Sequence, residues 1–178
     1  MALTLIKEDG IGKIDANSYA SAADSDAYHA GHLYATSWTG ATADNKAAAL
    51  VMASRVIDAE FQFNGVKTSA AQALQWPRSD CRDPDAVATS AGLGVIGSNV
   101  VPKGVTHATC ELARELLLLD RTTAPPGEGI ASDWTSTAGK KYSKTDVRPI
   151  LSRLVLSLLS KFGTPTRQGG GVVKLVRS

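Results

Sequence analysis

A helical repeat of apolar residues behind Pro102 constrains the fold of this chain more than any other feature. The repeat has three- and four-residue spacing and forms one stripe: Val105, Ala108, Leu112, Leu116 and Leu119. Proline is favoured in the first turn of a helix, so the pattern predicts a helix over about 102–121. An amphipathic helix of this length must bury its apolar face, and it therefore needs partners to pack against.

Two further stretches are expected to supply those partners. Residues 42–60 are rich in alanine and carry Leu50, Val56 and Ile57 at helical spacing, so propensity and periodicity both predict a helix. Residues 147–162 are apolar over more than half of a helix circumference. This last segment is predicted to be helical and to lie in the core or against another subunit.

Two shorter helices are indicated nearer the N-terminus. Ser21 and Asp24 fit a capping box, which predicts that a helix begins there and ends near Gly31. Thr68 is suited to cap a short helix that stops before Trp76-Pro77, because proline disfavours a helical conformation in the preceding residue.

The remaining segments have the composition of loops and extended ends. Residues 79–101 and 122–146 are predicted to be long loops, and residues 3–6 a short extended segment. Residues 163–171 resemble a glycine-rich flexible linker, and 172–177 an isolated strand. The predicted fold is all-α, a bundle of about five helices in a domain of residues 1–162, followed by a linker and tail over 163–178.

Composition excludes several protein classes. No apolar run is long enough for a membrane span, and no secretory leader is visible at the N-terminus. Cys81 and Cys110 are too few for a disulfide framework, which favours a reducing compartment. We expect a folded protein made in the cytosol that does not associate with membranes.

Charge is distributed unevenly along the chain. Residues 121–178 contain ten Lys and Arg against three Asp and Glu, whereas the whole chain has a net charge of only +2. A basic last third predicts an electrostatic partner, either nucleic acid or an acidic protein surface. The candidate contacts are Lys140, Lys141, Lys144 and Arg148, close to Trp134. The alternative is a solvated basic segment that only improves solubility.

The sequence contains no convincing catalytic, cofactor or metal site. Residues 92–97 spell GxGxxG, but they lack the preceding strand and the adjoining helix that a dinucleotide site requires. His29 and His32 have metal-ligand spacing, yet no further ligand completes a set, so exposed helix positions are the favoured interpretation. His107 and Cys110 have the same spacing, and there a buried, unreactive thiol is favoured over a nucleophile. We expect no enzyme activity, no cofactor and no metal.

The C-terminal tail is predicted to bind a partner. An isolated strand on a glycine-rich tether has no neighbour in sequence with which to pair, so strand addition to a partner's sheet is its natural use. The predicted contact residues are Val172, Val173, Lys174, Leu175, Val176 and Arg177. A frayed terminus is the alternative.

Several short motifs together resemble a known family. They include Ala16-Asn17-Ser18-Tyr19, Phe63-Asn64-Gly65 and Leu74-Gln75-Trp76-Pro77-Arg78, in that order, within about residues 10–120. The sequence is similar to the neck proteins of tailed bacteriophages, the head–tail adaptors or connectors. The same group is also described as DnaT-like single-stranded-DNA-binding proteins. Residues 122–146 match this pattern poorly.

The resemblance implies a structural virion protein, made in the host cytoplasm and placed between capsid and tail. Such adaptors form an oligomeric ring, typically of twelve copies, beneath the portal protein. Their C-terminal tails reach the portal, their other side meets a tail-side neck or tail-terminator protein, and non-specific contact with packaged DNA is expected. The alternative function is a single-stranded-DNA-binding replication protein, which would need basic and aromatic residues on one surface.

Overall fold

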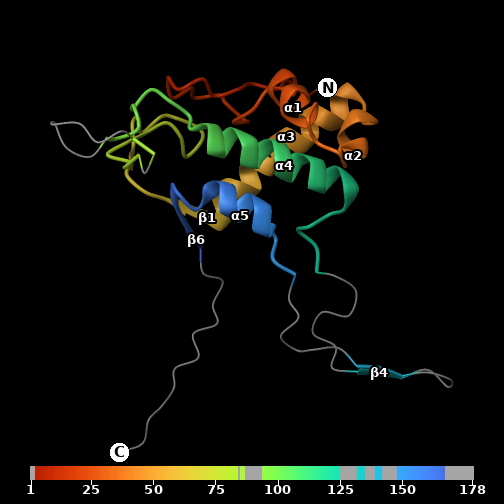
Figure 1. Cartoon of the computed structure of the whole chain (residues 1–178). Coiled ribbons are helices and arrows are strands. Elements are labelled where there is room, and N and C mark those ends of the chain that lie inside the picture. Colours follow the sequence, from red (N-terminus) through yellow and green to blue (C-terminus); the bar gives the residue numbers. More distant parts are fainter. Residues whose placement is uncertain are drawn as a thin grey trace, which may run out of the picture.

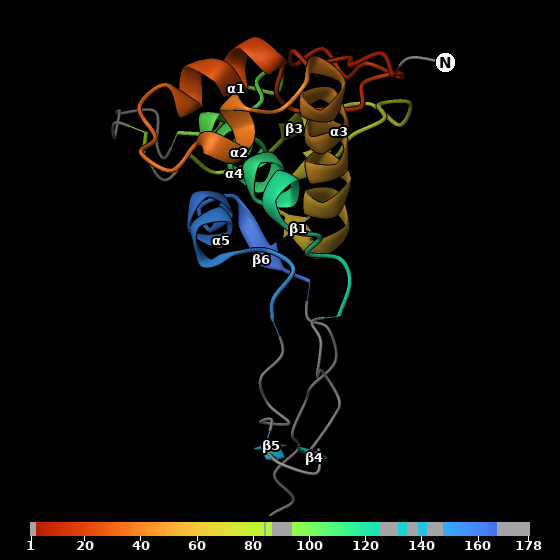
Figure 2. The same ribbon diagram turned by 90° about the vertical axis from the view of Figure 1, so that its right-hand side faces the viewer.

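The computed structural model describes residues 3–83, 85–86, 94–124, 132–134, 139–141 and 148–166. Within these residues there are five helices, α1 (Ala22–His29), α2 (Thr36–Thr39), α3 (Ala43–Glu60), α4 (Lys103–Leu118) and α5 (Arg153–Leu159). Helix α4 is central and packs against each of the others. Figures 1 and 2 show α3 crossing α4, with α1 and α2 on one side of α4 and α5 on the opposite side.

The apolar stripe of the long helix is confirmed as the centre of the core. Val105, Ala108 and Leu112 are fully buried, whereas Leu119 lies beyond the end of α4 and is 49% exposed. The largest buried side chains around this stripe come from other segments: Trp38, Trp76, Tyr19, Leu50 and Ile57. The core therefore joins segments that are distant in sequence, and α4 is the element that all of them share.

The predicted starts of two helices are confirmed by their caps. The Ser21 side chain accepts a hydrogen bond from Asp24 N, and the Asp24 carboxylate accepts one from Ser21 N, which is the expected capping box. Thr42 caps α3 in the same manner through Asn45 N. Helix α5 starts later than predicted, at the Ser152 cap, and it ends at Leu159.

The all-α prediction is wrong, because short antiparallel strands accompany the helices. Strand β1 (Phe61–Phe63) pairs with β6 (Gly163–Pro165), β2 (Val66–Lys67) with β3 (Arg78–Ser79), and β4 (Ser132–Trp134) with β5 (Gly139–Lys141). The fold is therefore mixed α and β. Strands of two or three residues are too short to show a period in the sequence, so a periodicity argument cannot detect them.

Strand β6 also changes the interpretation of the expected linker. The first three residues of that predicted linker form β6 and pair with β1, in a register that places Phe61 opposite Pro165 and Phe63 opposite Gly163. Phe61 and Phe63 are buried and Gln62 is exposed, which is the alternation of a strand with one face on the core. A Cβ on Gly163 would lie 2.2 Å from Gln62 O, so this glycine permits close strand pairing. Thus residues 163–165 belong to the folded body.

The short helix predicted from Thr68 is absent. The Gln72 side chain organises this segment instead, accepting from Ser69 N at 3.0 Å and donating to Leu74 O at 2.9 Å. A buried amide that satisfies backbone groups locally competes with helix formation. Conversely, no helix was predicted from the sequence at α2, which carries the buried Trp38.

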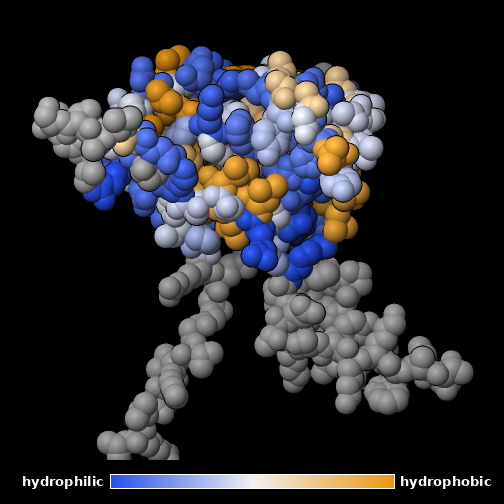
Figure 3. Space-filling view, viewed as in Figure 1, coloured by the Kyte–Doolittle hydropathy of each residue, from blue (hydrophilic) through white to orange (hydrophobic). Residues whose placement is uncertain are grey.

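Helix α5 leaves part of its apolar surface uncovered. Val155 and Leu159 are buried against the core, whereas Leu154 is 47% exposed. Figure 3 shows hydrophobic residues reaching the surface in the region of α4 and α5. None of the helices among the described residues is both long and apolar enough to cross a membrane.

A largely buried hydrogen-bond network joins three segments of the chain, through Tyr19, Asp58 and Gln75. The Tyr19 hydroxyl donates to the Asp58 carboxylate and accepts from Gln75 N at 2.9 Å, while Asp58 Oδ2 accepts from Gln75 N at 3.1 Å. Burial raises the pKa of Asp58 to about 6, although the hydrogen bonds from Tyr19 and Gln75 favour its ionised form.

This shift predicts a specific pH dependence of stability. Asp58 is protonated in both the folded and the unfolded state below pH 3.8; as the pH rises towards 7, the unfolded state ionises first. The wild type should therefore lose about 3 kcal/mol of stability relative to Asp58→Asn between pH 3.8 and pH 7. Denaturant unfolding of both proteins across this range measures the difference. His29 titrates in an overlapping range but is common to both proteins, so it cancels. A constant difference would contradict the prediction.

Candidate nucleic-acid interface

A groove between α1 and the start of α4 brings aromatic and basic side chains together. Its lining includes Tyr28 from α1, Lys103 and His107 from α4, and Lys7 from the N-terminal segment. The capping box fixes where α1 begins, and the buried stripe fixes the rotation of α4, so both helices present these residues to the same space.

The aromatic part of the groove is a pair of rings. The Tyr28 ring lies 4.9 Å from the His107 ring, centroid to centroid, at an interplanar angle of 42°, and 5.0 Å from His29 at 78°. Tyr28 is half-buried, and burial together with the nearby Glu111 raises the pKa of its hydroxyl. The ring is therefore neutral, held by its neighbours and partly open to the groove, as a stacking platform for a base must be.

The charges of the groove leave a positive surplus. Lys7 Nζ lies 2.7 Å from Asp24 Oδ2, so these two charges compensate each other. Burial would raise the pKa of Asp24, but the hydrogen bonds from Lys7 and Ser21 outweigh it and lower that pKa. Lys103 is exposed and has no ion pair with any residue that the structure describes. Its ammonium group is thus free to meet a phosphate.

Behind the groove lies a buried polar cluster with a structural role. The His29 ring approaches Cys110 O at 3.1 Å through Nε2, and burial lowers the pKa of His29, which keeps the imidazole neutral. Glu111 is buried and forms an ion pair with Arg114. His32 lies at the rim of this cluster, 3.7 Å from Glu111. No three metal-ligating side chains gather anywhere in the described parts of the chain.

Cys110 does not have the environment of a nucleophile. It is fully buried in α4, and burial raises the pKa of its thiol to about 11. The thiolate is the reactive form of cysteine, so this side chain is inert at neutral pH. His107, the other member of the pair considered from sequence, lies against Tyr28 in the groove.

The predicted basic contacts are only partly visible. Lys140 and Lys141 belong to β5, where their backbones lie opposite Asp133 and Ser132. Lys144 and the tail residues 172–177 lie outside the described residues. Their proposed contacts therefore remain predictions.

Arg148 is described, and it has a partner that the sequence did not reveal. Arg148 Nη2 donates to Asp120 O at 3.1 Å and to Thr123 O at 3.3 Å, while Arg121 Nε donates to Ile150 O at 2.7 Å. These two arginines, which we call the arginine clamp, join residues 120–123 to 148–150. The only sequence signal for Arg121 was its place at the end of the helix predicted over 102–121.

A comparison with protein families identifies the chain. The profile of one family, described as "Putative DnaT-like ssDNA binding protein", matches residues 3–178. The chain belongs to this DnaT-like family. The match covers the whole described fold and also the segments outside it. Searches of curated proteins and of solved structures found no match.

This membership corrects one expectation and supports another. The sequence resemblance suggested a virion head–tail adaptor first and a single-stranded-DNA-binding protein second. The family description names single-stranded DNA binding, and nothing in the comparisons supports a virion or adaptor role. The adaptor interpretation was drawn from motifs such as Leu74–Arg78, in which Leu74, Trp76 and Arg78 are buried and Arg78 begins strand β3. Buried positions of this kind fix the fold of this chain and do not by themselves specify what it binds.

Proposed function

We propose that this DnaT-like protein binds single-stranded DNA, as its family description suggests. The observation that carries the proposal is the family match across nearly the whole chain. The groove supports it independently, because it combines an accessible aromatic ring with an unpaired lysine, the two chemistries with which proteins hold unpaired nucleotides.

The proposal gives the two parts of the protein different tasks. Tyr28 stacks on a base, with His107 behind it, and Lys103 contacts the adjoining phosphate. The basic last third supplies long-range attraction to the phosphate backbone. This attraction is independent of sequence and weakens as the salt concentration rises, because the release of condensed counterions on binding then gains less free energy. The role needs no catalytic group, metal or cofactor.

Replacing Tyr28 with alanine tests the stacking contact. Stacking on an aromatic side chain contributes about 1–3 kcal/mol per base, so Tyr28→Ala should weaken binding roughly tenfold while leaving its salt dependence unchanged. Fluorescence anisotropy of a labelled oligonucleotide at several salt concentrations measures both quantities. The matched control is Tyr34→Ala, because Tyr34 is 76% exposed and lies outside the groove. Equal losses in both variants would refute the stacking role.

Neutralising Lys140, Lys141 and Lys144 tests the electrostatic contact. Each phosphate contact contributes about 0.7 to the slope of log K against log salt, so the triple glutamine variant should flatten that slope by about 2. The triple variant R55Q/K67Q/R82Q removes the same charge from exposed positions before residue 121 and should retain more of the slope. If the wild type does not bind at low salt, the proposed function itself is wrong.

A further inference from the structure

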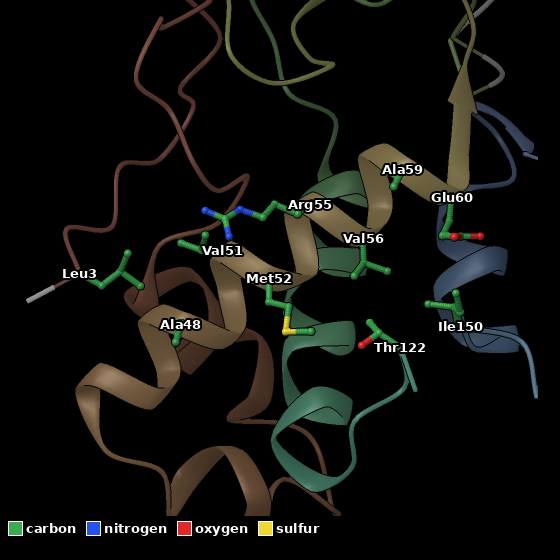
Figure 4. Close-up of a pocket in the computed structure, with 10 residues that line it drawn as sticks. All are labelled: Leu3, Ala48, Val51, Met52, Arg55, Val56, Ala59, Glu60, Thr122 and Ile150. Atoms are coloured by element: carbon green, nitrogen blue, oxygen red, sulfur yellow. The ribbon is translucent and has the colours of Figure 1, made fainter. Parts of the chain in front are cut away.

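A second groove, on the outer face of α3, is lined mainly by apolar side chains, and none of the residues that the structure describes fills it. It measures about 590 Å³, and its lining includes Val51, Met52 and Val56 of α3, together with Leu3, Thr122 and Ile150. Figure 4 shows Met52 and Val56 pointing from α3 towards Thr122 and Ile150. Met52 is 38% exposed and Leu3 is 46% exposed. Apolar side chains that converge on a hollow indicate a surface that another apolar segment covers.

The course of the chain at Thr166 points to the occupant. Strand β6 runs antiparallel to β1, which directly follows α3, so the chain leaving β6 heads back towards α3. Thr166 N donates to Glu60 O at 2.8 Å, and Glu60 is the last residue of α3 and part of the groove lining. The last described residue therefore lies at one end of the groove.

The length of the remaining chain fits the groove. Residues 167–171 can span up to about 17 Å when extended, and 172–177 about 20 Å more. The groove follows α3 from Glu60 back to Ala48, which is about 18 Å of helix. The linker thus suffices to turn the chain, and the following six residues suffice to run along the groove.

The composition of this segment also fits. Four of the residues from 172 to 177 are aliphatic, Val172, Val173, Leu175 and Val176. Residues 125–147 are joined to the body next to the groove, since Thr122 and Ile150 line it, but they are mostly polar and contain only Ile130 and Val147 as large aliphatic residues. Burying aliphatic side chains in an apolar groove stabilises the docked state by about 25 cal/mol for each Å² of apolar surface removed from water.

We propose that residues 172–177 dock in the α3 groove of their own chain and cover Met52 and Val56. This proposal is independent of DNA binding. It also differs from the strand-addition role predicted from the sequence, because the tail contacts a helix face of the same molecule.

A cysteine pair tests the docking in the full-length protein. The native Cys81 and Cys110 are both fully buried and give little background. Under mild oxidation in dilute solution, Val56→Cys with Leu175→Cys should form an intramolecular disulfide, seen as a mobility shift without reducing agent. It should form roughly tenfold faster than a control pair, because a docked segment has a high local concentration. The control joins Leu175→Cys to Leu33→Cys, since Leu33 is 89% exposed and outside the groove.

The alternatives give different products. Adding Met52→Glu to the test pair should slow cross-linking severalfold while the circular dichroism of the folded body stays unchanged, because Met52 lies at the surface of that body. Equal rates in the test and control pairs would overturn the proposal. A purely dimeric product would assign the groove to a second copy, and faster cross-linking of Val56→Cys with Tyr142→Cys would assign it to residues 125–147. Either result would also overturn the proposal.

Discussion

Replacing Trp76 with alanine should lower the free energy of unfolding by about 3–5 kcal/mol, the usual cost of deleting a large core aromatic. Trp76 is completely buried. Its ring meets Phe63 at 5.7 Å and Phe162 at 6.2 Å, both edge-to-face. These partners come from β1 and from the turn before β6, so the indole joins the strand pair to the rest of the core. Its loss would leave a cavity where three segments meet.

Denaturant unfolding, followed by circular dichroism, measures this effect. Leu33→Ala is the matched control, because that side chain is 89% exposed and should change stability by no more than about 0.5 kcal/mol. If Trp76→Ala were no more destabilising than this control, the indole could not be the contact that joins the strand pair to the core.

The second large effect is expected at Glu8. This side chain is completely buried, and its carboxylate accepts hydrogen bonds from Gly10 N at 2.8 Å, Gly12 N at 2.9 Å and Lys13 N at 2.8 Å. It thereby closes the N-terminal turn, in which Gly10 and Gly12 have φ angles of +106° and +76°. Removing it with Glu8→Ala leaves three amides without their acceptor and should cost roughly 3 kcal/mol, at about 1 kcal/mol for each.

Hydrogen exchange makes the Glu8 prediction specific. In Glu8→Ala the amides of Gly10, Gly12 and Lys13 should exchange much faster, whereas those in α4 should follow only the global loss of stability. Glu8→Gln keeps one carbonyl oxygen and should show an intermediate loss. Unchanged protection of the three amides in Glu8→Ala would show that another group closes this turn.

The long elements of the fold could be predicted from sequence, and the short ones could not. Residues 43–60 and 103–118 carry helical stripes, and Ser21 and Thr42 have side chains that cap, so local rules suffice there. Glu8 gave no such signal. An acidic residue in a polar segment is normally exposed, and its burial depends on three backbone amides that only the folded turn brings together.

The candidate interface escaped prediction for a related reason. Tyr28 and His107 are far apart in the sequence, with α2 and α3 between them. Their rings meet only because α1 packs beside α4. The sequence showed the histidines as possible partners at short spacing, His29 with His32 and His107 with Cys110. The structure places His29 beside Cys110, an arrangement that spacing along one helix does not reveal.

The arginine clamp has a consequence for how this protein can vary. Arg121 and Arg148 hold the two ends of residues 125–147 against each other. This stretch is therefore a loop whose ends are already fixed by the folded body. Doubling the length of a closed flexible loop costs only about 0.6 kcal/mol. Insertions, deletions or wholesale exchange of this stretch should therefore leave the core intact. The folded body and this stretch are therefore separable in energy: the stretch can change in length or sequence while the body keeps its fold.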